Sequence, residues 1–145
     1  MMEMFPFTPA DWITVQAASH AVLNATLADD DVLAESYFNN LMMVLNELCG
    51  KYGEHPVLIE TEADFADDPV QQVIRYRCAL RLAEAHQLPT LSIRLSLARV
   101  LLEHFGDSSV ARNELMACQH EMAENVDRST KSEWSELLAQ CGESP

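Results

Sequence analysis

Three carboxylates in the segment HPVLIETEADFADDP, residues 55–69, are the side chains best suited to catalysis. Glu60, Glu62 and Asp64 lie close together in sequence, and paired carboxylates can act as a general acid and a general base. Glu60 and Asp64 are four residues apart, so in a helix they lie on the same face. No neighbouring pattern supplies a pocket, and a solvated helix face explains the same spacing. The sequence therefore predicts no catalytic residue.

The cysteines and histidines show no metal-ligand spacing. None of the four cysteines belongs to a CxxC pair, and each lies in an apolar helical pattern typical of a buried, reduced thiol: Cys49, Cys78, Cys118 and Cys141. His120 is two residues from Cys118, so the two side chains do not share a helix face. His55 precedes Pro56 in a predicted turn, where it can hydrogen-bond locally. We expect no metal and no cofactor, because the chain also lacks a glycine-rich phosphate loop.

Acidic residues are concentrated in the first half of the chain. The net charge is −14; residues 1–68 hold 13 acidic side chains and one basic, whereas residues 69–145 hold 10 acidic and eight basic. Phosphate backbones bind basic surfaces, so we expect no nucleic-acid partner. The charge leaves open an acidic regulator or inhibitor that binds a basic partner through residues 1–68, although solubility explains the acidity equally well.

Composition indicates a single domain, 1–145, since 145 residues with 48% hydrophobic content can bury a core of their own. The first ten residues, MMEMFPFTPA, contain no Lys or Arg. The longest uncharged run, Trp12–Ala28, is too polar to span a membrane. We therefore expect a soluble, cytoplasmic protein without a membrane partner.

The segment Leu91–Asp107 organises the predicted fold. Its apolar residues recur at steps of three and four, as on one side of a helix. Thr90 can cap its start, Gly106 suits the left-handed residue that ends a helix, and Asp107 can cap the next helix. So short a turn forces the following helix, Ser108–Asn125, to fold back antiparallel.

The run SLARVLLEHFGDSSVARNELMACQ resembles one tetratricopeptide repeat. Ala98 matches the small residue of the first helix, Gly106 and Asp107 match the turn, and Ala111 matches the small residue that opens the second helix. The resemblance implies an all-α fold of antiparallel helical hairpins, in a tetratricopeptide-like right-handed stack of about six to seven helices. It divides the chain into an irregular hairpin at 9–56, repeat-like units at 57–89 and 90–124, and a capping helix at 130–141. A compact bundle of the same hairpins remains an alternative.

The capping residues Thr8, Asp31 and Asp68, together with apolar periodicity, predict four further helices, at Pro9–Ala28, Val32–Cys49, Pro56–Phe65 and Pro69–Gln87. We expect Gly50 and Gly53 to end the second of them. Within the third of these, Val57–Ile59 alone is also compatible with a strand. The second helix is the most apolar, and we expect it at the centre of the N-terminal packing. Its broad apolar surface is compatible with a homodimer, although core packing explains it as well.

The candidate binding site is the narrow polar stripe on the helix that begins at Leu91. The stripe consists of Ser92, Ser96, Arg99 and Glu103. The resemblance implies that the first helix of each unit lines a groove, which places Glu60 and Asp64 beside the stripe. This arrangement favours a structural salt bridge between Arg99 and Glu60 or Asp64, and it is also compatible with a polar groove that receives a peptide.

We therefore expect a non-catalytic protein–protein interaction module that binds a peptide or protein partner through this groove. A small helical ligand-binding protein or enzyme, with a pocket at Glu60, Asp64 and Arg99, is the first alternative. The acidic regulator or inhibitor of a basic partner is the second. The partner, the ligand and the oligomeric state are not specified by any motif in the chain.

Overall fold

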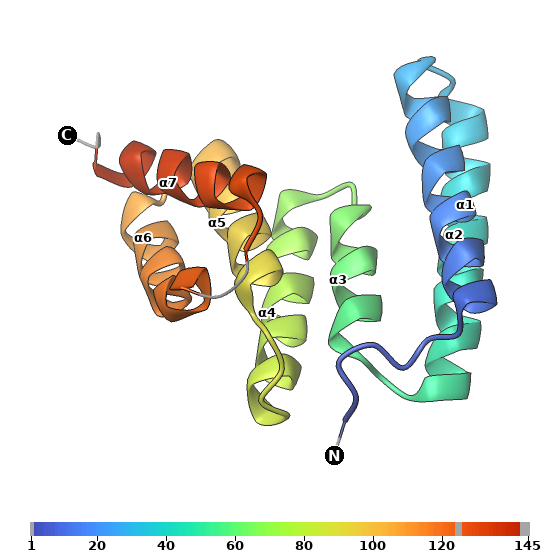
Figure 1. Cartoon of the computed structure of the whole chain (residues 1–145). Helices are drawn as coiled ribbons and strands as arrows, with labels where there is room; N and C mark the ends of the chain where they lie inside the picture. Colours follow the sequence, from blue (N-terminus) through green and yellow to red (C-terminus); the bar gives the residue numbers. More distant parts are fainter. Residues whose placement is uncertain (1, 124–125, 143–145) are drawn as a thin grey trace.

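The computed structural model describes residues 2–123 and 126–142, and over these residues it contains helices and no strand (Figure 1). The α-helices are α1 (Pro9–Leu27), α2 (Asp31–Tyr52), α3 (Pro56–Asp64), α4 (Pro69–Ala85), α5 (Leu91–Phe105), α6 (Ser108–Ala117) and α7 (Arg128–Gly142); a 3-10 helix, η1, spans Gln119–Ala123. None of these helices combines the length and the apolar character that crossing a membrane requires. The all-α prediction is confirmed, and the strand alternative is wrong.

Side-chain caps fix the starts of most helices. Thr8 accepts a backbone N–H of the first turn of α1 at 3.1 Å, and Pro9 supplies the fixed φ that suits a first helical position. The same pairing of a capping side chain with a following proline begins α3 and α4. α2 is capped by Asp30, one residue before the predicted Asp31. Thr90 makes no capping bond through its side chain at α5, contrary to the prediction.

Residues with positive φ end several helices. Gly106, at 58°, ends α5 as predicted, and Gly53, at 82°, follows α2. Gly50 lies inside α2 and does not interrupt it, contrary to the prediction. Gln87 also has positive φ, at 57°, so α4 stops before the predicted helix end at this residue.

α6 is shorter than the sequence predicts. It ends at Ala117, and the chain then tightens into η1; the predicted end at Asn125 lies outside the described residues. Two long-range contacts favour this turn over a longer helix. The Trp134 indole N–H donates to the carbonyl of Leu115 at 2.9 Å, and Glu121 in η1 reaches the start of α5.

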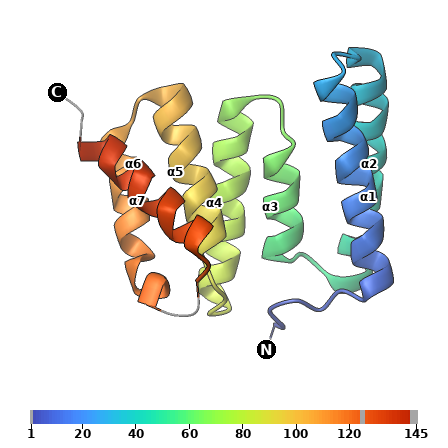
Figure 2. The ribbon, with the colours of Figure 1, turned by 45° about the horizontal axis from the view of Figure 1, so that its top comes forward.

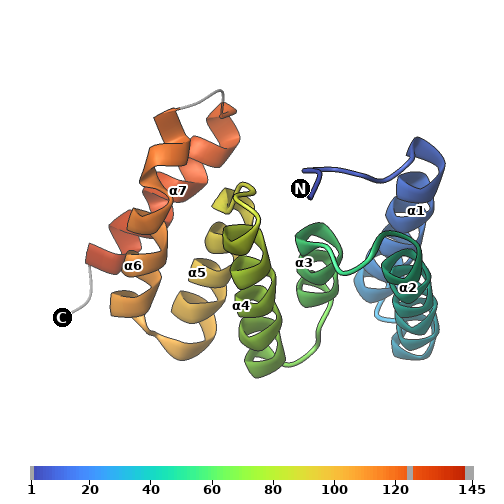
Figure 3. The same ribbon diagram turned by 90° about the horizontal axis from the view of Figure 1, so that it is seen from below.

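Consecutive helices pack against one another and alternate in direction (Figures 1 and 2). α1 packs on α2, α3 on α4 and α5 on α6, while contacts between α2 and α3 and between α4 and α5 join these pairs. α7 packs on α6 and α5. The result is a row of helices with α1 and α2 at one end and α6 and α7 at the other (Figure 3).

The buried side chains form two clusters that meet at α3. The larger cluster is built from α3 to α7 and includes Leu97 and Leu115, both fully buried. The smaller cluster is built from α1, α2 and Phe7, which precedes α1. α3 contributes Ala63 to the larger cluster and Leu58 to the smaller. This short helix is therefore the physical link between the two ends of the row.

α2 is buried over only its second half. Leu41, Leu45 and Leu48 are buried, whereas Val32 in the first turn is 82% exposed and Leu33 is also exposed. The expectation that this helix is central to the N-terminal packing therefore holds for its C-terminal half alone. The N-terminal half leaves apolar side chains on the surface.

Candidate functional site

The structure brings most of the predicted groove residues together on one side of α3 and α5. Ser92 on α5 donates a hydrogen bond to Glu60 on α3, with 2.8 Å between Oγ and Oε2. Ser92, Ser96 and Arg99 line a shallow depression of about 430 Å³ between α5 and the start of α7. Glu103 is exposed on α5 and does not line this depression.

Arg99 pairs with a residue that the sequence did not suggest. Its guanidinium forms an ion pair with Glu133 on α7, and both side chains are about two-fifths exposed. The prediction that Arg99 forms a salt bridge was correct, but the predicted partners, Glu60 and Asp64, were wrong. We define the polar face as the surface formed by Glu60, Asp64, Ser92, Ser96, Arg99 and Glu133. An exposed pair such as this one contributes only about 0–1 kcal/mol to stability, so it can be opened by a competing ligand.

Glu60 is the most strongly perturbed carboxylate of the polar face. Burial, and to a smaller extent the charge of Asp64, together raise the pKa of Glu60 to about 7, although the hydrogen bond from Ser92 opposes the change. Near neutral pH a large share of the Glu60 side chains carries a proton. Glu60 can therefore either donate or accept a hydrogen bond towards a bound group.

Asp64 is held in place by a buried tyrosine. The Tyr76 hydroxyl on α4 donates to the Asp64 carboxylate, and Tyr76 is only 3% exposed. Burial raises the pKa of Tyr76, and the adjacent carboxylate raises it further, so the hydroxyl stays protonated as a donor. Restricted solvation raises the pKa of Asp64 although the residue keeps surface exposure, while Tyr76 and Arg99 oppose this effect.

A second polar cluster lies between α4, α5 and α6, and sequence reasoning missed it. Arg94 on α5, whose side chain is 12% exposed, donates to Glu114 at 2.6 Å and to Glu84 at 3.3 Å. Arg77 lies 3.6 Å from the other oxygen of Glu114. The available signal was Arg94 itself, a charged residue between the buried residues of α5, since a charge in such a place needs a partner. The cluster joins three helices.

Glu121 caps α5 from a distant part of the chain. Its carboxylate accepts the backbone N–H groups of Thr90 and Leu91, at 2.9 and 3.1 Å, and the Thr90 hydroxyl at 2.6 Å. A carboxylate at this position satisfies free amides and complements the positive end of the helix. The sequence did not indicate Glu121 because 30 residues separate it from Leu91.

His55 has a structural role. It is 2% exposed; its Nδ1 accepts the N–H of Val57, so Nε2 carries the proton that is donated to the Glu3 carbonyl at 2.7 Å. The Phe7 ring is in edge-to-face contact with His55, and the Tyr52 ring in turn packs against Phe7. The predicted local hydrogen bond is present, together with a long-range bond that fastens the segment before α1 to the start of α3.

The cysteines differ in exposure more than the sequence predicts. Cys118 and Cys141 are buried, and burial raises the pKa of Cys118 to about 11, so its thiol is unreactive at neutral pH. Cys49 is half-buried, and Cys78 is exposed on α4, contrary to the prediction. Among the described residues, no three His, Cys, Asp or Glu side chains are grouped so as to hold a metal ion.

The chain was also compared with known proteins. No protein family, curated protein sequence or solved structure matches it. The all-helical architecture is thus known from the structure alone. The likeness of residues 96–119 to a tetratricopeptide repeat stays a prediction. The geometry of the polar face is therefore the basis for proposing a function.

Proposed function

We propose that the protein is a non-catalytic interaction module of tetratricopeptide-like type, which binds a peptide or a segment of a protein along the polar face. The observation that carries the proposal is one shallow depression on which hydrogen-bonding side chains of α5 and α7 converge, with Glu60 of α3 bonded to Ser92, which lines it. Ser92 and Ser96 line its floor with Arg99 beside them. Such a shallow, open surface with several hydrogen-bonding side chains suits a chain of backbone carbonyls and amides better than a compact metabolite.

Arg99 is the expected anchor for the bound segment. Its planar guanidinium presents several donors in a fixed geometry, which suits a carboxylate or successive backbone carbonyls. Its present partner, Glu133, lies on α7 and is itself partly exposed. A ligand can therefore take over this guanidinium at low cost while Glu133 turns to solvent.

Site-specific photo-crosslinking tests this function. A photo-reactive residue at Ser96 should crosslink a partner protein, whereas the same residue at Asn113, exposed on α6 and away from the polar face, should not. A peptide from the captured protein should then bind the chain, and Arg99→Ala should weaken binding by about 1 kcal/mol or more, as for interface anchors. Equal crosslinking at both positions, or unchanged affinity of Arg99→Ala, would refute a role for the polar face.

One observation favours the ligand-binding or enzyme alternative. The pKa of Glu60 is raised to about 7 by burial, and carboxylic acids that function as general acids or bases often titrate near the working pH. Against this alternative, Arg99 is paired with Glu133 and does not complete a cluster with Glu60 and Asp64. A thermal-shift screen against metabolites distinguishes the two functions. A metabolite that raises the melting temperature by several degrees, in the unmodified chain but not in Glu60→Gln, would favour this alternative.

A further inference from the structure

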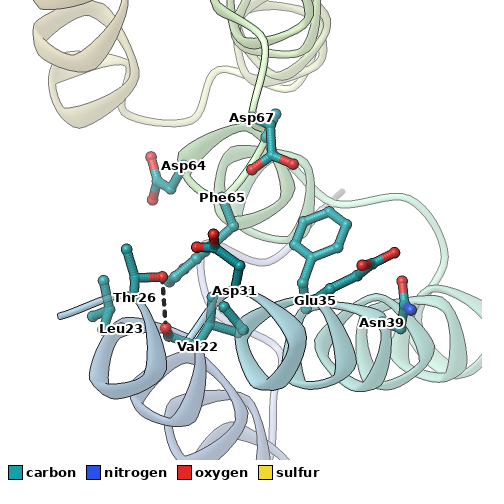
Figure 4. Close-up of a pocket in the computed structure, with 12 residues that line it drawn as sticks. Val22, Leu23, Thr26, Asp31, Glu35, Asn39, Asp64, Phe65 and Asp67 are labelled. Carbon is teal, nitrogen blue, oxygen red and sulfur yellow. Dashed lines mark hydrogen bonds between the residues drawn. The ribbon is translucent and has the colours of Figure 1, made fainter. Parts of the chain in front are cut away.

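A cleft lies on the side of α3 that faces α1 and α2. It separates the end of α3 from the last turns of α1 and the first half of α2. The cleft has a volume of about 720 Å³, which lies within the usual ~300–1,000 Å³ range of ligand sites. Its lining includes four carboxylates and no basic side chain: Asp31 and Glu35 from α2, and Asp64 and Asp67 from the end of α3 and the loop that follows. Figure 4 shows that these two sets of carboxylates come from opposite sides of the cleft.

The floor of this acidic cleft is apolar. Val22 and Leu23 of α1, Phe38 of α2 and Phe65 after α3 all line it. Leu23 is 49% exposed, and the neighbouring Leu27 is exposed further. Aromatic and aliphatic side chains beneath a rim of carboxylates would hold a ligand that carries both apolar groups and positive charges.

The backbone adds to the negative potential. α1 ends beside the cleft at Leu27 and α3 ends beside it at Asp64, and neither helix has a basic residue in its last turn. The carbonyl ends of helices carry partial negative charge, so both termini favour a cation. The positive end of α2 is also nearby, but Asp30 caps it and Asp31 lies in its first turn.

We propose that the acidic cleft is a second binding site, which takes a basic amphipathic peptide segment of a partner protein. The apolar side chains of the segment pack on Leu23, Phe38 and Phe65, while its Lys or Arg side chains lie among the carboxylates of the rim. Charge complementarity argues for this occupant, since residues 1–68 hold 13 acidic side chains against one basic. The site is distinct from the polar face, although Asp64 borders both.

Fluorescence anisotropy with a labelled synthetic peptide of repeating Leu-Leu-Lys-Lys tests the proposal. The peptide should bind the full chain, and binding should weaken as salt is added. The double variant Glu35→Gln/Asp67→Asn should weaken binding about tenfold, as expected when charges that face bound cations are removed. The matched double variant Glu47→Gln/Glu54→Gln removes the same charge from exposed positions outside the cleft, and it should change affinity less than twofold.

Two further probes test the apolar half of the proposal. Leu23→Ser should weaken binding of the peptide, and a peptide in which Ser replaces Leu should bind at least tenfold less tightly. Equal binding of the Ser peptide, or of spermidine at the same concentration, would overturn the proposal in favour of a simple cation site. Equal weakening by the cleft and control pairs would overturn it in favour of diffuse charge attraction.

The outcomes separate this site from the polar face. Arg99→Ala should leave affinity for the basic peptide unchanged, so loss of binding in that variant alone would place the peptide on the polar face and refute the cleft. A concentration-dependent dimer in sedimentation velocity, broken by Glu35→Gln/Asp67→Asn, would instead identify a second copy of the chain as the occupant. Either result leaves the function proposed for the polar face to its own crosslinking test.

Discussion

The α1–α2 pair and the α3–α7 assembly are both helical, but they are held together differently. In α3–α7, the large apolar cluster is accompanied by partly buried ion pairs between Arg94 and Glu114 and by the carboxylate cap that Glu121 provides. In the α1–α2 pair, the small apolar cluster is accompanied by the ion pair of Lys51 with Asp11, in which Lys51 is more than half exposed. Charged groups thus join helices at both ends, but they are partly buried in α3–α7 and lie near the surface in the α1–α2 pair.

The difference indicates that the two ends of the row have unequal stability. Partly buried, hydrogen-bonded charges contribute more than exposed pairs, and α5 packs against three other helices, α4, α6 and α7. The first half of α2 has no such cover. We expect the α1–α2 pair to open locally before α3–α7 does, since low burial and exposed backbone bonds mark the less stable parts of a protein.

Truncating a buried leucine at each end should produce the largest effects. Leu97→Ala should lower the free energy of unfolding by about 2–5 kcal/mol, because a fully buried leucine leaves a cavity. Leu41→Ala, equally buried, should increase hydrogen exchange mainly in α1 and α2. If both substitutions accelerate exchange throughout the chain to the same extent, the two ends form one cooperative unit.

Removing the carboxylate cap of α5 should have the next largest effect. Glu121→Ala leaves the amides of Thr90 and Leu91 without their acceptor, and we expect a loss of about 1.5–3 kcal/mol, the range for hydrogen bonds to a charged group. Urea unfolding measures this loss in the free energy of unfolding. His120→Ala, at an exposed neighbouring position, is the control and should be near neutral. A loss below about 0.5 kcal/mol for Glu121→Ala would mean that water replaces the cap, because surface substitutions stay within this limit.

His55 links the N-terminal segment to α3, so its removal should weaken the smaller cluster. His55→Ala should cost about 1–2 kcal/mol, near the upper range for the loss of a cap. His55→Asn keeps a capping oxygen but loses the bond to the Glu3 carbonyl. The Asn variant should therefore lose protection of the N-terminal segment in hydrogen exchange while α3 stays protected; loss of both would make the two bonds inseparable.

Stability should depend on pH through Glu60. Its pKa is about 7 in the folded chain, above the ordinary 4.5, so the folded chain binds this proton more tightly than the unfolded chain. The resulting stabilisation is fully present below pH 4.5 and is lost as the pH rises through about 7. The full pKa difference corresponds to about 3 kcal/mol, and solvent screening of this partly exposed carboxylate lowers the expected effect to about 1–2 kcal/mol. Glu60→Gln should flatten this dependence and Glu54→Gln should not. An unchanged pH profile in Glu60→Gln would assign the dependence to another group.

Arg99→Ala should affect stability least. The pair with Glu133 is exposed, so its loss should cost about 0–1 kcal/mol in thermal or urea unfolding. Glu133→Gln removes the other partner of the pair, on α7, and should lower the free energy of unfolding by a similar amount. A loss above about 2 kcal/mol in both variants would make the pair a structural bond between α5 and α7, because isolated surface pairs do not reach that value.

Local features of the fold were predictable from the sequence. Apolar periodicity located all seven α-helices of the described residues, and capping residues such as Thr8, Asp68 and Asp107 located several starts within a residue. Gly106 adopts the left-handed conformation that its position implied. These features depend on residues a few positions apart, so the chain near each residue contains the necessary information.

Long-range contacts were not predictable in the same way. The partner of Arg99 is Glu133 and the cap of α5 is Glu121, and both depend on how α7 and η1 turn back onto α5. Periodicity identifies which face of a helix is polar, but it does not identify which helix that face meets. Ser92 and Glu60 were correctly placed side by side because a resemblance supplied the missing geometry.

The bond between the Glu3 carbonyl and His55 also bears on the order in which the chain assembles during synthesis. Glu3 leaves the ribosome long before its donor is made, because 52 residues separate them. α1 and α2 can begin to pair before His55 emerges from the ribosome, because their contacts need no later residue than Tyr52. Until then, the segment before α1 lacks its contacts with His55, and Phe5 and Phe7 are more exposed than in the folded chain. Phe7 gains its ring contact with His55, and Glu3 its hydrogen bond, only after His55 emerges.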